Sequence, residues 1–120
     1  MKSKLVSWKK DELIYEIGDR SDFAYLLVNG QIILTSSEDI RIGIIKADEI
    51  FGERSLLMSS KRSVNAKAFI DSSAIKISKE MLSNEFKKTP LIIQAILRST
   101  FLRLDSANII GDKIKDLNFD

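Results

Sequence analysis

The chain has 120 residues and a formal net charge of +2, and 44% of its residues are hydrophobic. This length and composition suit one compact domain with an ordinary core, and the nearly balanced charge gives no sign of a nucleic-acid partner. Cys and His are both absent, which excludes disulfide scaffolds, zinc sites built on thiolates or imidazoles, Cys nucleophiles and imidazole bases.

The sequence contains neither a membrane span nor a secretory signal. No stretch approaches the roughly 20 apolar residues that a membrane-spanning helix requires. The lysine-rich first ten residues lack the apolar run of a signal peptide. We therefore expect a soluble, cytoplasmic protein with no membrane partner.

Residues 13–77 alternate short apolar runs with turn residues, a rhythm typical of an all-β sandwich or barrel. Asn29 and Gly30 separate the apolar runs 23–28 and 31–34, and this dipeptide favours a type I′ turn. We therefore predict a two-residue β-hairpin there. Residues 40–44 and 74–77 alternate as expected for strands with one face inward.

After residue 77 the pattern becomes helical. Residues 78–86 predict a short helix, and Thr89 and Pro90 predict the start of a second one, with a hydroxyl at the N-cap and Pro at the first helical position. Apolar and small residues then recur at spacings of four and three up to residue 114. A helix of about 25 residues would be about 38 Å long, more than one small domain covers, so we expect its far end to pair with a second subunit in a homodimer.

Residues 51–66 combine residue types that core packing does not explain. Gly52 permits close backbone approach, and successive N–H groups at the start of a helical turn suit an anion. Arg62 offers a planar fork that matches phosphate oxygens, and an ionised Glu53 accepts from a ligand hydroxyl. The set predicts a sugar-phosphate clamp. The alternative is a plain Glu53–Arg62 ion pair across a loop, which contributes about 0 to 1 kcal/mol when exposed.

This segment resembles the phosphate-binding cassette of the cyclic nucleotide-binding domain family, which includes catabolite activator proteins, regulatory subunits of cyclic-AMP-dependent kinase and cyclic-nucleotide-gated channels. The matching residues follow the family pattern without a gap: Phe51-Gly52-Glu53, Ser55, Leu56-Leu57 and Arg62-Ser63. Residues 13–19 and 25–32 resemble the family's first strand and its Gly-centred strand pair, and the last helix resembles its dimer or lid helix. In all, the resemblance covers about residues 10–115.

The resemblance implies a mainly β fold with C-terminal helices (α+β) in a single domain, residues 1–120. A double-stranded β-helix jelly-roll barrel would occupy about residues 5–77, and a short helix and a long helix would follow over about 78–117.

The resemblance also implies a role for each cassette residue. Glu53 would bind the ribose 2′-hydroxyl, and Gly52 and Ser55 would offer backbone N–H groups to the cyclic phosphate. Arg62 would neutralise that phosphate, and Ser63 would hydrogen-bond to the phosphate or the base. Ser63 does not decide between adenine and guanine, because a hydroxyl residue there occurs in relatives of both preferences.

The purine would need an apolar wall and a cap. Ile42 and Ile44 are predicted to form the wall, because they lie on the strand before the cassette. In relatives a residue from the long helix or beyond it caps the base, so the resemblance implies Ala107 or Asn108 as the cap, and the Asn108 amide would read a purine edge.

Three residues depart from the family pattern. Arg54 replaces an apolar residue, Lys61 replaces the Pro before the cassette arginine, and Asp48 replaces a Gly. Lys61 should make the loop before Arg62 more flexible than a Pro would. Asp48 should tolerate a positive φ less well than the glycine that it replaces. Arg54 and Lys61 also raise the local positive potential, which favours a phosphate, so we include Arg54 among the ligand-binding residues.

We therefore expect a sensor domain, not an enzyme, that binds cyclic AMP or cyclic GMP, uses no cofactor or metal, and signals through its C-terminal helix or through dimerisation to an unidentified downstream protein. With no DNA-binding helices after the last helix, we expect no direct output to DNA. A degenerate member that serves as a dimerisation or docking module without nucleotide is the alternative. A third hypothesis is a hydrolase built on carboxylates such as Asp48, Glu49 and Glu53.

Overall fold

The computed structural model describes residues 4–100 of the chain. Its strands and helices, in chain order, are β1 (Lys4–Trp8), β2 (Leu13–Tyr15), β3 (Phe23–Asn29), β4 (Gln31–Thr35), β5 (Arg41–Lys46), β6 (Ile50–Phe51), α1 (Glu53–Leu57), β7 (Asn65–Ala68), β8 (Ser72–Ser78) and α2 (Lys79–Lys88). Residues 91–100 are also helical. The predicted continuation of that helix to about residue 117 lies outside the described residues.

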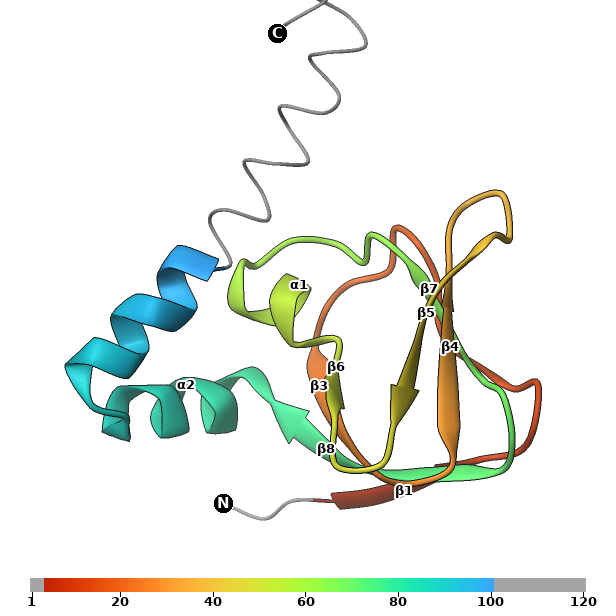
Figure 1. The fold of residues 1–120 in the computed structure, drawn as a ribbon, viewed down its shortest axis with the longest axis horizontal. Helices are drawn as coiled ribbons and strands as arrows, with labels where there is room; N and C mark the ends of the chain where they lie inside the picture. Colours follow the sequence, from red (N-terminus) through yellow and green to blue (C-terminus); the bar gives the residue numbers. More distant parts are fainter. Residues whose placement is uncertain (1–3, 101–120) are drawn as a thin grey trace, which may run out of the picture. The chain divides into compact units, whose positions relative to one another are not determined.

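The strands form two antiparallel sheets of four strands each (Figure 1). One sheet has the order β1-β8-β3-β6 and the other the order β2-β7-β4-β5. The predicted mainly β architecture with helices after it is confirmed. Within residues 4–100 no strand pairing joins the two sheets, so they do not close into the expected barrel.

The core lies between the two sheets, because alternate residues of both point inward. Its buried members come from six strands: Tyr15, Leu27, Ile32, Phe51, Ala66, Ala68 and Ala74. A smaller cluster around Leu56 joins α1 to β3, β8 and the first turn of α2. Leu56 and Phe51 are almost completely buried, so the segment between them is held at both ends by core packing.

The predicted hairpin at Asn29 and Gly30 is wrong, because β3 and β4 belong to different sheets. Gly30 has the positive φ of 94° that the dipeptide favours. However, Ser72 of β8 fills the corner beside it: a Cβ on Gly30 would overlap the Ser72 hydroxyl, which also accepts from the Gln31 N–H at 3.1 Å. The turn preference is therefore met at a point where the chain crosses from one sheet to the other.

The chain divides into two compact units, Met1–Ser83 and Asn84–Asp120. The first contains both sheets and α1. In the second, the Gln94 side chain donates to the Thr89 carbonyl at 2.8 Å, and the Thr89 hydroxyl donates to the Glu85 carbonyl at 3.0 Å. The single domain 1–120 stays a prediction.

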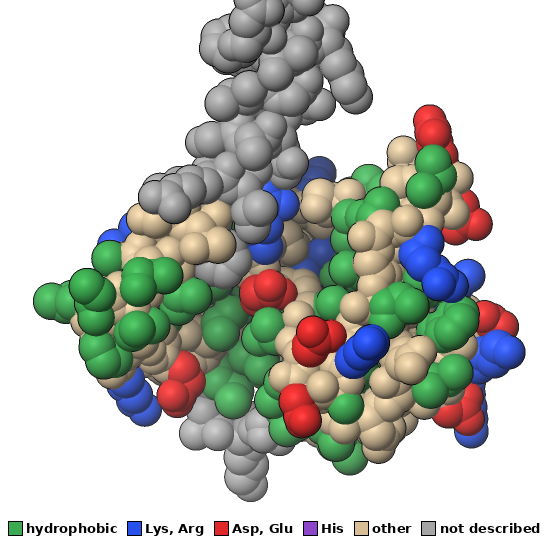
Figure 2. Space-filling view, in the orientation of Figure 1, with side chains coloured by type: hydrophobic (Ala, Val, Ile, Leu, Met, Phe, Trp, Pro, Cys, Tyr) green, Lys and Arg blue, Asp and Glu red, His purple; other side chains and the backbone are tan. Residues whose placement is uncertain are grey.

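The surface of the described part mixes residue types. On the face shown in Figure 2, hydrophobic, acidic and basic side chains alternate over the strands without a large patch of one charge. No helix within residues 4–100 has both the length and the apolar character needed to cross a bilayer.

Candidate functional site

A left-handed glycine turns the chain from β6 into α1 at the cassette. Gly52 is the N-cap of α1 and has φ 79°, a conformation that residues with a Cβ rarely adopt. The Glu53 carboxylate follows at once in the first turn, and the Ser55 side chain is buried. This short connection brings the Gly52 carbonyl, Glu53 and Ser55 to one end of the sheets.

The Arg62 guanidinium lies beside this turn, in the interior of the protein. Its Nη1 donates to the Gly52 carbonyl at 2.8 Å and to the Ser55 hydroxyl at 2.9 Å, and its Nη2 donates to the Phe23 carbonyl. The guanidinium carbon lies 4.0 Å from the centroid of the Tyr15 ring. Only 4% of Arg62 is exposed, and its buried Nε–H has no acceptor.

The Arg62 main chain is fixed from the other side. Its N–H donates to the Asp19 carbonyl at 3.0 Å, and its carbonyl accepts from the Gly18 N–H at 2.9 Å. The Ser21 hydroxyl donates to the Ser60 carbonyl at 2.7 Å. The loop before the arginine is therefore anchored by hydrogen bonds, although Lys61 lacks the rigidity of a Pro.

A pocket of about 220 Å³ opens beside these groups. The residues lining it come from both sheets and the cassette: Tyr15, Leu34, Ile45, Ile50, Phe51, Gly52, Glu53, Arg54, Ser55, Arg62, Ser63 and Val64. The structure thus brings together all six cassette residues that the sequence indicated. The lining combines polar side chains of the cassette with apolar side chains of the strands.

Ile42 and Ile44 are not part of the apolar lining. Ile42 is 54% exposed, and neither residue lines the pocket. Side chains alternate along β5, and Ile45, which is paired with the buried Ile32, faces the core instead. The predicted wall is therefore one residue out of register, and Leu34, Ile45 and Val64 form it. The adjacent isoleucines Ile44 and Ile45 fit either register, and both have buried partners, but only Ile45 and its partner Ile32 belong to the core cluster.

The predicted cap, Ala107 or Asn108, lies outside the described residues. Asp48 adopts the positive φ that a glycine would accept, at 71°. Its N–H donates to the Leu27 carbonyl at 2.8 Å, which ties the turn before the cassette to β3. The turn therefore has the backbone conformation usual for a glycine, and Asp48 bears the conformational strain of a positive φ.

The electrostatics of the pocket follow from burial. Burial raises the pKa of Glu53, and a hydrogen bond from its own backbone and the charges of Arg62 and Arg54 oppose that rise. Burial also raises the pKa of Tyr15 to about 12, although the Arg62 charge lowers it. The ion pairs found between described residues, Arg20–Asp22 and Lys88–Glu85, do not include Arg62. The alternative of a plain Glu53–Arg62 ion pair is therefore wrong, and the buried cation faces neutral oxygens.

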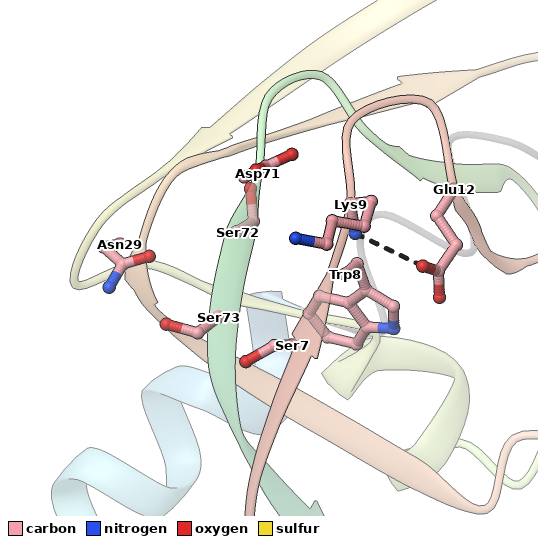
Figure 3. Close-up of a pocket in the computed structure, with 8 residues that line it drawn as sticks. All are labelled: Ser7, Trp8, Lys9, Glu12, Asn29, Asp71, Ser72 and Ser73. Atoms are coloured by element: carbon pink, nitrogen blue, oxygen red, sulfur yellow. Dashed lines mark hydrogen bonds between the residues drawn. The ribbon is translucent and has the colours of Figure 1, made fainter.

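A second, larger hollow of about 360 Å³ lies at another part of the sheets (Figure 3). Lys9, Glu12 and Asp71, the charged residues that line it, are exposed. The Glu12 carboxylate accepts from the Lys9 N–H at 3.2 Å. This hollow contains no buried charge that needs a partner, so we place the candidate site at the cassette.

The comparisons with known proteins agree with this geometry. The family model for the cyclic nucleotide-binding domain matches residues 5–89. The cAMP-bound form of the EAL enzyme Bd1971 is 26% identical, with a TM-score of 0.75 over 98% of this chain and 34% of that chain. Its cGMP-bound form is 27% identical, with a TM-score of 0.79 over 96% and 32%. The chain thus spans about a third of the length of these two Bd1971 chains.

The Thermus thermophilus catabolite activator protein shares the fold, at 23% identity and a TM-score of 0.72 over 94% of this chain and 55% of that chain. The comparison with curated proteins finds no match. The family model covers most of the chain, including both sheets, the cassette and Arg62, and on this evidence the chain belongs to the cyclic nucleotide-binding domain family.

Proposed function

We propose that this chain binds a 3′,5′-cyclic purine nucleotide in the pocket beside Arg62 and acts as a regulatory sensor without catalysis of its own. One observation carries the proposal: Arg62 is a buried cation that forms no salt bridge with a described residue, next to the Gly52 turn. Burial of an unpaired charge is costly, so such a site favours an anionic guest.

The hydrogen bonds of Arg62 support the same conclusion. A guanidinium has five N–H groups. The Arg62 guanidinium makes three hydrogen bonds to protein oxygens. The Nε–H is one of the groups that remain. Because Ser55 accepts from Arg62, its own hydroxyl proton is left to donate to a phosphate oxygen.

The rest of the nucleotide fits the remaining lining. With the cyclic phosphate at Arg62 and Ser55, the ribose 2′-hydroxyl would donate to Glu53, and the purine would lie against Leu34 and Ile45. Bd1971 is described in both cAMP-bound and cGMP-bound forms, so both nucleotides are candidates here.

Signalling would follow from a population shift. Phosphate capture would favour one arrangement of the cassette, and the helix that begins after Pro90 would respond by movement or by dimerisation with a second copy. A downstream protein would then read the change.

A second candidate, a docking or dimerisation module without nucleotide, has one observation in its favour. The Arg62 guanidinium already donates to Gly52, Ser55 and Phe23, so protein oxygens satisfy part of its hydrogen-bonding capacity without a bound nucleotide. This candidate predicts a dimer whose stability is indifferent to nucleotide.

Calorimetric titration and thermal unfolding with cyclic AMP, cyclic GMP and 5′-AMP test the proposal. A cyclic nucleotide at about 100 times its Kd should stabilise the chain by about 2.7 kcal/mol, and 5′-AMP should do less. Arg62→Ala should abolish the effect. Arg20→Ala, which removes an exposed arginine paired with Asp22, should preserve it. Neither heat nor a thermal shift with both cyclic nucleotides would contradict the proposal.

A further inference from the structure

We propose that Tyr15 is a positioning residue for nucleotide binding, whose ring face holds the plane of the Arg62 guanidinium at the cassette. This inference rests on the proposed function. Its main observation is the stack itself, with the guanidinium carbon 4.0 Å from the ring centroid. Both partners are buried, at 7% exposure for Tyr15 and 4% for Arg62, and desolvation strengthens a contact between a cation and a ring.

The hydrogen bonds and the ring restrain different motions of Arg62. The donors of a guanidinium lie in its plane, so the bonds to Gly52, Ser55 and Phe23 fix its edges. A ring against the flat face restrains tilt out of that plane. No carboxylate performs this task among the described residues, because the observed ion pairs leave Arg62 out.

The ring itself is well fixed. Tyr15 is the last residue of β2 and pairs with Ala66 of β7. Its ring also packs against Phe51, with centroids 6.4 Å apart. Phe51 directly precedes Gly52, so one pair of aromatic rings supports both the arginine and the turn that faces it.

The ring, and not the hydroxyl, makes the contact. The pKa of Tyr15, raised by burial to about 12, keeps the phenol neutral at physiological pH, so the contact is between a cation and a neutral ring. None of the hydrogen bonds between described residues uses the Tyr15 hydroxyl. Tyr15→Phe is therefore the conservative variant, and Tyr15→Leu removes the ring face.

Titration with cyclic AMP tests the inference in three variants of the full chain. Tyr15→Leu should bind about tenfold more weakly, the effect expected when a desolvated contact of this kind is lost. Tyr15→Phe should stay within about twofold of wild type. Trp8→Leu is the matched control, because Trp8 packs against Phe51 in the same aromatic group but does not contact Arg62, and it should also stay within about twofold.

A second measurement needs no nucleotide, and its wild-type and Tyr15→Phe spectra can be interpreted even if Tyr15→Leu does not fold. In ¹⁵N-labelled wild type and in Tyr15→Phe, the Arg62 Nε–H proton should resonate upfield of the other arginine Nε–H protons, because it lies near a ring face. The shift should disappear in Tyr15→Leu. If wild type binds no nucleotide, the proposed function fails, and this resonance alone decides whether Tyr15 positions Arg62.

Three results would overturn the inference. One is unchanged affinity in a folded Tyr15→Leu variant. Another is a loss of affinity in Tyr15→Phe as large as that in Tyr15→Leu, which would assign the effect to the hydroxyl. The third is an Arg62 Nε–H resonance in wild type without a ring-current shift.

Discussion

Gly52 and Arg62 lie so close together that a side chain at position 52 would have to displace the guanidinium. The Gly52 carbonyl accepts from Arg62 Nη1 at 2.8 Å, and a Cβ on Gly52 would lie 2.7 Å from that same nitrogen. The φ of 79° at Gly52 adds a second reason for glycine. Glycine at position 52 thus leaves room for the Arg62 guanidinium and also permits the backbone turn.

Gly52→Ala should therefore cost more than backbone strain. We expect a loss of about 1 to 2 kcal/mol in stability from the left-handed conformation, together with displacement of the guanidinium and at least tenfold weaker binding of cyclic AMP. Denaturant unfolding and calorimetric titration measure the two effects.

Gly18→Ala provides the control. Gly18 has a similar φ of 91°, but a Cβ there would meet nothing within 4 Å, and alanine retains the N–H that donates to the Arg62 carbonyl. It should lose stability and keep its affinity for nucleotide. Equal affinities in the two alanine variants would show that the contact with Arg62 is unimportant.

Asp48→Gly should stabilise the chain. Asp48 has a φ of 71° in the turn before the cassette, and glycine adopts this conformation without a Cβ penalty. We expect a gain of about 0.5 to 1 kcal/mol, after allowance for the greater freedom of glycine in the unfolded chain. Thermal unfolding should show a rise of about 4 to 8 °C per kcal/mol. Asp48→Ala should show no gain, and a gain of equal size would assign the effect to the charge.

Glu53 should make stability fall as the pH rises. Burial raises its pKa above the ordinary 4.5 in the folded chain, so between the unfolded and folded values the folded state binds more protons. Stability then decreases with pH across this window above 4.5 and stays lower at neutral pH. Glu53→Gln should thus be more stable than wild type at pH 7, and the difference should shrink toward pH 4. Urea unfolding at both pH values measures it, and a constant difference would contradict this prediction.

The same residue should determine selectivity for the ribose. If Glu53 accepts from the 2′-hydroxyl, wild type should prefer cyclic AMP over 2′-deoxy cyclic AMP by about tenfold, since a hydrogen bond to a charged group contributes about 1.5 to 3 kcal/mol. Glu53→Gln should lose much of this preference. Competition titration compares the two ligands, and an unchanged ratio would place the sugar elsewhere.

The cassette could be predicted from the sequence because its residues are neighbours in the chain and each has a distinct chemical task. Gly52, Glu53, Ser55, Arg62 and Ser63 all line one pocket, as expected. The partners of Arg62 could not be predicted in the same way. Tyr15 and the Phe23 carbonyl reach the guanidinium only through the pairing of distant strands.

The wrong predictions have the same origin. Asn29 and Gly30 specify a local backbone conformation, but they do not specify whether the next strand pairs with the last one or crosses to the other sheet. Ile44 and Ile45 are both apolar, so alternation alone could not say which one faces the core. The packing of Ile45 and its partner Ile32 into the core cluster decides this, and such packing is a property of the whole fold.

The main-chain hydrogen bonds that join Arg62 to Gly18 and Asp19 bear on the design of shorter variants. A fragment that began after Asp19 would retain every cassette residue and yet leave the arginine's peptide groups without their anchors, and it would also lack the Tyr15 ring. Minimal versions built for biosensors should therefore start before β2, and a split version should be cut elsewhere, for instance in the exposed turn between β4 and β5.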